Sequence, residues 1–221
     1  MSALAQFFLH FGKKVFGYDL TPSPITDSLI QMGAVIHFTE QDHLIPDHID
    51  LVIVTPAIPK THLELIWFQN QQIPIMKRSE VLGFICLDYP TIAVAGTHGK
   101  TTTSSLIAHI LRHSGFGCNA FLGGIAANYN SNFWSSDRAV SVAEADEYDK
   151  SFLAMFPSMA VVLNIEPDHL ECYDGVEDLI GSFLTYINRG PFYGSAVVSA
   201  DDPNIAGIRS RINRPHVSFG F

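Results

Sequence analysis

The segment Thr91–Thr103 constrains the fold of this 221-residue chain more than any other part of the sequence. An apolar, partly β-branched run, Thr-Ile-Ala-Val-Ala, leads into Gly-Thr-His-Gly, and Lys-Thr-Thr-Thr then opens a stretch with helical periodicity. Glycines let the backbone wrap a phosphate with its N–H groups, and the N-terminus of the following helix adds positive potential. The order of strand, glycine loop and helix therefore predicts a parallel α/β domain with a phosphate-binding loop.

Two residues of this loop have side chains suited to nucleotide chemistry. Lys100 would reach the β- and γ-phosphates, and the Thr101 hydroxyl would hold Mg²⁺. The loop departs from the common P-loop because Val94 stands five residues before Gly99, where that pattern has its first glycine. A polar helix start behind a glycine turn is the alternative interpretation, and His98 could either contact a ligand or fill a polar loop position. The candidate nucleotide-binding residues are Gly96, Thr97, His98, Gly99, Lys100, Thr101 and Thr102.

Composition excludes several classes of protein. A net charge of −9 argues against a nucleic-acid-binding surface, which requires clustered Lys and Arg. With 47% hydrophobic and 16% charged residues, the chain can bury a core rather than stay disordered. Cys86, Cys118 and Cys172 are far apart, which indicates unpaired thiols in a reducing compartment. Because no apolar run approaches ~20 residues and the start lacks secretory signals, we expect a cytoplasmic protein without membrane insertion.

Short β-branched runs alternate with segments of helical period along the whole chain. Thr101–Ser114 and Val176–Asn188 gather apolar residues on one face and predict amphipathic helices, and Ser2–Gly12 reads as a further helix. Several runs are apolar at every position, as expected for strands covered on both faces, so the alternation predicts a parallel α/β sheet. The candidate strands are Val15–Tyr18, Ala34–Phe38, Leu51–Val54, Ile73–Met76, Thr91–Ala95, Ala139–Ala143, Met159–Leu163 and Ala196–Ser199.

A domain boundary is predicted near Leu87–Pro90, where a turn-forming segment separates a first group of about four strands from the strand that enters the glycine loop. The first domain would span residues 1–88 and the second residues 89–221. Asp19, at the end of the first strand, could be the acid that binds a ribose in a Rossmann-like unit, although the glycine turn of such a unit is absent. An ordinary turn aspartate explains Asp19 equally well.

Acidic and amide side chains gather where two candidate strands end. In a parallel sheet, ligands bind outside the carboxyl ends of the strands, so these side chains are candidates for a metal or substrate site. A solvated acidic loop explains the first group about as well, and a single histidine there is more typical of a hydrogen-bonded surface residue, because Mg²⁺ prefers oxygen ligands. The first group is Glu144, Asp146 and Glu147, and the second is Asn164, Asp168 and His169.

Six short motifs follow one another along almost the whole chain: Thr55–Pro59, Lys77–Glu80, Gly96–Thr103, Glu144–Glu147, Asn164–Leu170 and Pro191–Gly194. In this order they resemble the motifs of the Mur ligases. The glycine loop looks like the ATP loop of these ligases rather than that of kinases or GTPases. Any one motif would be weak evidence, but their order makes the resemblance specific. The set is most similar to the members of the family that add L-alanine.

The resemblance implies a ligase of peptidoglycan synthesis that depends on ATP and Mg²⁺ and joins L-alanine to the carboxylate of UDP-N-acetylmuramate. In this chemistry the carboxylate attacks the γ-phosphorus of ATP, which gives an acyl phosphate and ADP, and the amine then displaces phosphate. The first step brings two anions together. Charge neutralisation by Lys100 and two Mg²⁺ ions would therefore supply most of the rate acceleration.

The resemblance also implies roles for single residues. Glu144 matches a Mg²⁺ ligand near the γ-phosphate, and His169 matches a histidine that helps to hold a second Mg²⁺. Lys100, Glu144 and His169 are thus the catalytic candidates, and Thr101, Glu144 and His169 the metal ligands. The first domain is implied to be a Rossmann-like UDP-binding domain, and the second a truncated P-loop-type ATPase domain with a parallel sheet. The implied substrate-binding residues are Asp19, Thr55, Arg78 and Asn164.

The two ends of the chain differ from the family pattern. The family's glycine-rich turn would stand immediately before Met1, and Phe219–Phe221 would lie partway through the central ATP-binding domain. We therefore expect either a truncated ligase or a natural remnant that binds nucleotide, with little or no ligase activity by itself. Loss of the first strand would leave a sheet edge unpaired and lower the stability.

Other functions stay open at the level of sequence. The related ligase that reattaches a recycled tripeptide to UDP-N-acetylmuramate has a similar loop and acidic motif, whereas a folate polyglutamate ligase fits the first domain less well. A nucleotide-binding switch would bind ATP without forming a bond. Phe121–Asn132, with paired glycines and three asparagines, could hydrogen-bond a sugar-like substrate or be an ordinary turn-rich loop. Pro191–Gly194 and Asn128–Asn132 favour the L-alanine-adding enzyme, and the oligomeric state is not indicated.

Overall fold

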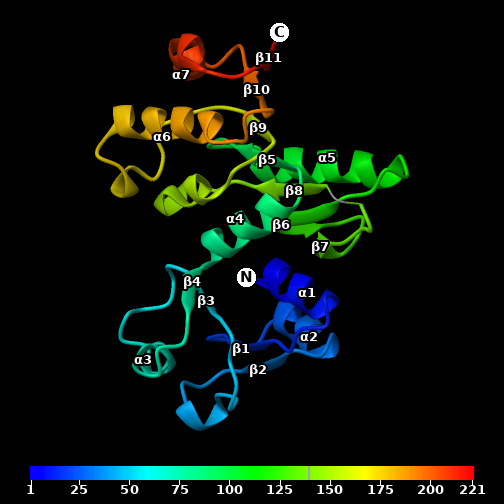
Figure 1. Ribbon diagram of the computed structural model, residues 1–221, viewed down its shortest axis with the longest axis vertical. Helices are drawn as coiled ribbons and strands as arrows, with labels where there is room; N and C mark the ends of the chain where they lie inside the picture. Colours follow the sequence, from blue (N-terminus) through cyan, green and yellow to red (C-terminus); the bar gives the residue numbers. More distant parts are fainter. Residues whose placement is uncertain (139) are drawn as a thin grey trace. The chain divides into compact units, whose positions relative to one another are not determined.

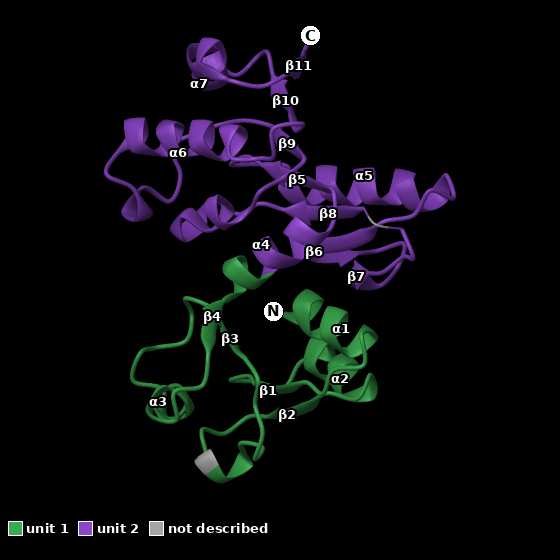
Figure 2. Ribbon diagram, viewed as in Figure 1, with its two compact units in different colours: residues 1–81 green, residues 82–221 purple. Residues whose placement is uncertain are grey.

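The computed structural model describes residues 1–138 and 140–221 (Figure 1). The chain divides into two compact units, Met1–Val81 and Leu82–Phe221, which Figure 2 colours separately. The division falls inside helix α4 (Arg78–Asp88), which runs from the first unit into the second. The boundary predicted from the sequence, near Leu87–Pro90, lies at the C-terminal end of the same helix. Within the described residues, no helix is both long and apolar enough to cross a bilayer.

The second unit is built on one seven-stranded sheet with the order β11-β10-β9-β5-β8-β6-β7. Neighbouring strands are parallel except β6 and β7, which pair antiparallel at one edge. β5 and its neighbours β8 and β9 lie at the centre, so the loops after these strands share one edge of the sheet. The strands are β5 Thr91–Ala95, β6 Asn119–Ala126, β7 Ser131–Trp134, β8 Ser141–Glu144, β9 Met159–Val162, β10 Ser195–Ser199 and β11 His216–Phe219.

Small and β-branched residues fill the centre of this sheet. Val94 of β5, Val142 of β8 and Val162 of β9 are completely buried, which is the pattern of strands covered on both faces. Helix α5 covers part of the sheet, since its Ala108 belongs to one core cluster with Leu122 of β6. The helices and 3₁₀ turns of this unit are α5 Lys100–His113, α6 Val176–Asn188, α7 Pro203–Ile208, η2 Tyr148–Ala154, η3 Leu170–Cys172 and η4 Arg209–Arg211.

A group of buried aromatic rings fixes α6 against the strand that enters the glycine loop. The ring of Phe152 stacks on Tyr186 with centroids 5.1 Å apart and packs edge-on against Phe183 at 5.0 Å. The Tyr186 hydroxyl donates to the backbone carbonyl of Ala93 in β5 at 2.7 Å. Burial raises the pKa of Tyr186 well above its ordinary value, so this hydroxyl remains a donor. The loop therefore begins from a rigid strand.

The first unit has a more open construction. Among the described residues it holds two separate two-stranded parallel sheets, β1–β2 and β3–β4, and each strand is three residues long. Ser23 and Thr26 start α2 with a capping box, in which each side chain accepts a hydrogen bond from the backbone N–H of the other. The elements are α1 Ser2–His10, β1 Phe16–Tyr18, α2 Pro24–Gln31, β2 Val35–His37, η1 Asp42–Leu44, β3 Val52–Val54, α3 Leu63–Asn70 and β4 Ile75–Lys77.

All eight predicted strands are present, with ends shifted by no more than two residues. The strand predicted from Ala139 begins at Ser141, and Ala139 itself lies outside the described residues. The predicted parallel α/β sheet is confirmed, and one edge departs from it, because β7 pairs antiparallel with β6. The strands β6, β7 and β11 were missed. Phe121–Asn132, predicted as a loop, instead runs through β6 and a turn into β7.

Candidate functional site

The glycine loop connects β5 to α5 through a backbone that only glycine adopts readily. Gly96 has φ +142° and Gly99 has φ +84°. A Cβ atom on Gly96 would lie 3.1 Å from Cβ of Leu163 and 3.2 Å from the backbone N of Asn164. Gly99 is the N-cap of α5 and leaves the helix without a side-chain cap. The first N–H groups of α5 are therefore not used by a capping side chain, as an anion-binding helix start requires.

A segment after β9 holds this loop in place. Asn164 Oδ1 accepts from His98 N at 2.8 Å, and Asn164 Nδ2 donates to His98 O at 3.1 Å. The Thr97 hydroxyl accepts from Glu166 N at 2.8 Å and donates to Glu166 O at 3.2 Å. The amide of Asn164, which the sequence suggested for substrate binding, is therefore engaged with the loop backbone. Asn164 shapes the loop from outside.

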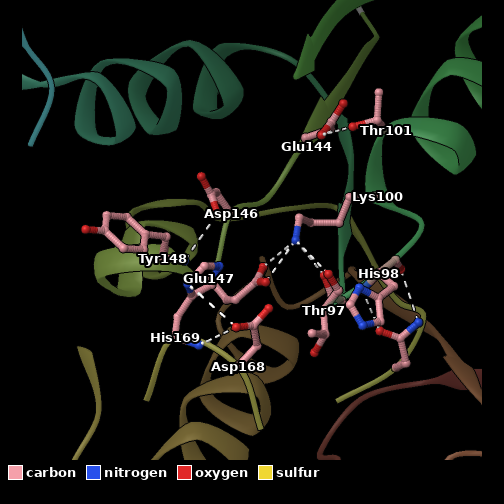
Figure 3. A network of polar contacts seen from close by, with 12 residues as sticks. Thr97, His98, Lys100, Thr101, Glu144, Asp146, Glu147, Tyr148, Asp168 and His169 are labelled. Carbon is pink, nitrogen blue, oxygen red and sulfur yellow. Dashed lines mark hydrogen bonds and ion pairs between the residues drawn. The ribbon is translucent and has the colours of Figure 1, made fainter. Parts of the chain in front are cut away.

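Lys100 lies at the centre of the polar network in Figure 3. Its ammonium donates to the Gly96 carbonyl at 2.7 Å and to the two carboxylate oxygens of Glu147 at 2.9 and 2.8 Å. Glu147 is 1% exposed, and the Tyr173 hydroxyl donates to its backbone carbonyl at 2.5 Å. Burial, helped by the charge of Glu147, raises the pKa of Tyr173. Sequence reasoning counted Glu147 among the acidic candidates for a metal or substrate site but did not pair it with Lys100, because neither its burial nor its partner is visible in the sequence.

Glu144 and Thr101 meet where β8 ends and α5 begins (Figure 3). The Thr101 hydroxyl donates to Glu144 Oε2 at 3.0 Å. The Ser104 hydroxyl and the Gly123 N–H donate to Glu144 Oε1 at 3.2 and 2.5 Å. A Cβ atom on Gly123 would lie 2.5 Å from Glu144 Oε2, so any larger residue there would require the carboxylate to shift. The structure thus brings two predicted metal ligands together, and it adds Ser104 and Gly123, which sequence reasoning missed as partners of Glu144.

His169 makes its contacts with a different group of side chains. Its Nδ1 lies 3.9 Å from Asp168 Oδ1 and 3.7 Å from Glu171 Oε1, and its ring packs edge-on against Tyr148. Its φ of +52° is uncommon for a residue other than glycine, and such backbone occurs often at functional sites. Figure 3 shows His169 and the Thr101 side chain on opposite sides of Lys100.

The predicted set of metal ligands is therefore only partly assembled. In the part of the chain that the structure describes, no three His, Cys, Asp or Glu side chains form a metal cluster. The oxygen atoms of Thr101 and Glu144 nevertheless fit Mg²⁺, which prefers hard oxygen ligands and usually keeps several of its waters. Beside them, Lys100 and the uncapped start of α5 fit the phosphates of a nucleotide. Thr102, also predicted to bind nucleotide, is exposed in the first turn of that helix.

The candidates in the first unit all lie at the carboxyl ends of its strands. Asp19 follows β1, Thr55 follows β3, and Arg78 follows β4 as the first residue of α4. Asp19 is exposed, and its Oδ1 accepts from the backbone of Thr21 at 3.3 Å, which is the local turn of the ordinary alternative. The pKa of the Met1 amino group is lowered by burial and then by the charge of Arg78, and Asp19 opposes this. The charges of Asp19 and Arg78 thus act on the same region.

Comparison with known proteins agrees with the motifs. Residues 1–89 match the model described as the Mur ligase family catalytic domain, and residues 94–221 match the Mur ligase middle domain. A UDP-N-acetylmuramate–L-alanine ligase of Flavobacterium johnsoniae is 44% identical over 98% of this chain and 49% of its own length. One of Porphyromonas gingivalis is 48% identical over 92% of this chain and 46% of its own length. The chain spans about half the length of these curated relatives.

Solved structures extend the likeness to three dimensions. A UDP-N-acetylmuramate–alanine ligase from Thermotoga maritima matches with a TM-score of 0.84 at 27% identity, over 100% of this chain and 50% of that one. A UDP-N-acetylmuramate:L-alanyl-gamma-D-glutamyl-meso-diaminopimelate ligase from Neisseria meningitides matches with a TM-score of 0.90 at 22% identity, over 100% of this chain and 74% of that one, and shows the fold alone. These matches confirm the predicted α/β fold class and the predicted resemblance. The chain belongs to the Mur ligase family.

Proposed function

We propose that this chain provides the sugar-nucleotide-binding and ATP-binding parts of a ligase that joins L-alanine to the carboxylate of UDP-N-acetylmuramate. The observation that carries the proposal is the arrangement of Lys100 beside the Thr101–Glu144 pair, at the carboxyl edge of β5 and β8. The names of the relatives in Flavobacterium johnsoniae and Porphyromonas gingivalis support the choice of substrates. The reaction would proceed through an acyl phosphate, which forms when the carboxylate attacks the γ-phosphorus of ATP and releases ADP.

The residues around the loop have contacts that suit this reaction. Lys100 would offset the charge on the transferred phosphoryl group, and the N–H groups at the start of α5 would hold its oxygens. Mg²⁺, held by Thr101 and Glu144, would lower the repulsion between ATP and the substrate carboxylate. This metal matters here because Glu144 and Glu147 already place two carboxylates beside the loop. We assign His169 to a second Mg²⁺ on the strength of its family motif.

The first unit would bind the sugar nucleotide, as the second would bind ATP. We assign the UDP group to residues 1–88, with ATP bound by residues 89–221. Asp19 cannot neutralise a diphosphate, so it would accept hydrogen bonds from the ribose or the uracil. Arg78 would pair with an anionic group, and Thr55 would contact the substrate at the end of β3. Their shared position at carboxyl ends of strands supports this assignment.

The test is acceptor-dependent release of ADP by the protein expressed from its complete reading frame. The assay holds ATP, Mg²⁺ and UDP-N-acetylmuramate, and L-alanine, other amino acids or a tripeptide are supplied in turn. We expect release that requires both L-alanine and the sugar nucleotide. It should disappear in Lys100→Met and persist in Lys13→Met, which removes an exposed lysine of the first unit.

The alternatives give different results in the same assay. A preference for the tripeptide would identify the recycling ligase. Nucleotide binding without release for any acceptor would identify a binding remnant or a switch. Release that is unchanged in Lys100→Met would contradict the assignment of the loop.

A further inference from the structure

The ammonium group of Lys100 is surrounded by more acceptor oxygens than it has N–H donors. It carries three donors, and four acceptors lie within hydrogen-bond distance: the Gly96 carbonyl at 2.7 Å, the Thr97 carbonyl at 3.4 Å and the two Glu147 carboxylate oxygens at 2.8 and 2.9 Å. The Lys100 side chain is 18% exposed, whereas the side chain of Glu147 is 2% exposed. A nucleotide that uses Lys100 must therefore break or share a bond that already exists.

The backbone of Glu147 is held in place from several directions. Its carbonyl accepts from the Tyr173 hydroxyl at 2.5 Å and from Lys150 N at 3.0 Å. Lys150 is fixed in turn by an ion pair with Asp178 at 2.7 Å and by a left-handed backbone with φ +53°. Asp149 has the same φ of +53°, so two successive residues hold a conformation that non-glycine residues seldom adopt. Glu147 therefore stands on a turn that has little freedom to move.

Lys100 differs from Glu147 in this respect. Its ammonium sits on a flexible four-carbon chain that starts from the first residue of α5, next to the uncapped N–H groups of that helix. A rotation of its side chain changes the direction of the charge without moving the backbone. When a phosphate arrives, the lysine is the partner that can turn.

We propose that Glu147 masks Lys100, so that the polyphosphate of a nucleotide binds by taking the lysine away from this buried carboxylate. The proposal rests on the assignment of the loop to ATP. Masking lowers the observed affinity by the fraction of time for which Lys100 is available, and it favours ligands with enough negative charge to compete with a carboxylate. Di- and triphosphates meet this condition better than a monophosphate. Glu147 is thus a positioning residue that acts through Lys100.

The test compares Glu147→Gln with the wild-type 221-residue chain. Glutamine keeps the shape of the side chain and an oxygen that can accept from Lys100, but it removes the competing charge. Calorimetric titrations in Mg²⁺ with ADP, AMP and inorganic tripolyphosphate supply a readout independent of ligation. We expect the Kd of the variant for ADP and tripolyphosphate to fall about tenfold, which corresponds to ~1.4 kcal/mol, with a smaller change for AMP.

Two further variants separate masking from general effects. Glu166→Gln makes the same change in charge close to the loop, where its 58% exposed side chain lies 3.6 Å from His98 rather than on Lys100. It should change the Kd by less than about twofold, because an exposed charge is screened by solvent. Glu147→Asp keeps the charge but draws it back by one methylene. It should give a Kd between those of the wild type and Glu147→Gln.

The outcomes distinguish this inference from the proposed function. If the wild type binds ADP and Glu147→Gln binds it equally or less tightly, Glu147 does not mask the lysine, while the nucleotide site stands. An equal gain in Glu166→Gln would reduce the effect to general electrostatics and would also overturn the inference. If neither the wild type nor Glu147→Gln binds any polyphosphate, the assignment of the loop fails and the inference fails with it.

Discussion

The two units of the chain are both built on parallel strands, but they differ in the size of their sheets and in how deeply the strands are buried. In the second unit, four- and five-residue strands at the centre of a seven-stranded sheet are almost entirely buried. In the first, three-residue strands form two-stranded sheets among the described residues, and no position of these strands is fully buried. Both units carry their candidate residues at the carboxyl ends of parallel strands. In the second unit those residues are joined by a dense set of mutual hydrogen bonds.

This difference shows how charged side chains are held in position at a site. Lys100, Glu144 and Glu147 are each held by two or more contacts with groups that are themselves buried or fixed. Asp19 is exposed and bonds to its own turn. Phosphoryl transfer requires charges that are positioned in advance, whereas recognition of a nucleoside can be built from weaker contacts. We therefore expect substitutions in the second unit to have the larger effects.

Replacing Lys100 should have the largest effect. Lys100→Met leaves the carboxylate of Glu147 buried without its cation, which should lower the free energy of unfolding by ~3–5 kcal/mol and abolish ADP binding. Chemical denaturation and calorimetry measure the two effects. In the double variant Lys100→Met/Glu147→Gln, stability should return to within ~1 kcal/mol of the wild type while binding stays lost. A single variant as stable as the wild type would show that the pair is not important for the fold.

The loop glycine should come second. Gly96→Ala must adopt a φ near +142° and place a Cβ atom 3.1 Å from Leu163, so we expect a loss of ~2–4 kcal/mol in stability, with weaker ADP binding. Gly115→Ala is the matched control, because Gly115 also has a positive φ of +78° but nothing within 4 Å of the added carbon. It should cost about half as much and leave binding intact. Equal losses in both variants would mean that crowding at the loop is unimportant.

A smaller effect is expected where Glu144 is positioned. Gly123→Ala would push a Cβ atom against the Glu144 carboxylate, so the concentration of Mg²⁺ needed for half-maximal ADP binding should rise about tenfold. Titration of Mg²⁺ at fixed ADP measures this shift. Gly181→Ala, inside α6 with open space around it, should leave the Mg²⁺ dependence unchanged. If the Mg²⁺ dependence shifts in Gly181→Ala but not in Gly123→Ala, the assignment of Glu144 to the metal site is wrong.

The smallest effect belongs to the first unit. Asp19→Asn keeps one carbonyl acceptor on an exposed side chain, so we expect UDP binding to weaken by about threefold, the size of one net hydrogen bond of ~0.7 kcal/mol. ADP binding should not change. Fluorescence or calorimetric titration with each nucleotide checks both statements. A change in ADP binding as large as the change in UDP binding would contradict the assignment of UDP to the first unit and of ADP to the second.

Local patterns account for most of what the sequence revealed about the fold. The strand Thr91–Ala95 and the helix Val176–Asn188 were predicted with their correct bounds, because continuous apolar runs and one-sided periodicity are properties of adjacent residues. The strand β6 was missed because Gly123 and Gly124 interrupt its apolar run, and paired glycines usually mark a loop. The strand β11 was missed because most of its positions are exposed and give no apolar signal.

Site residues could be predicted only where a local motif specifies both the residue type and its role. Lys100 and Thr101 were found because a glycine loop before a helix calls for them. The pairing of Lys100 with Glu147 depends on a turn with left-handed residues and on the hydroxyl of Tyr173, 26 residues away in the chain. The contact of Gly123 with Glu144 likewise joins residues 21 positions apart. Such contacts follow from tertiary packing and leave no local pattern.

The central claim is that the loop Gly96–Thr102 receives the phosphates of ATP while the first unit receives UDP. Amide chemical-shift mapping of the ¹⁵N-labelled 221-residue chain tests it most directly, with ADP and Mg²⁺ added to one sample and UDP to another. The account predicts that ADP shifts the amides of residues 96–102, Gly123 and Glu147, and that UDP shifts those around Asp19, Thr55 and Arg78. Shifts from ADP that spare residues 96–102, or that fall mainly in the first unit, would contradict it.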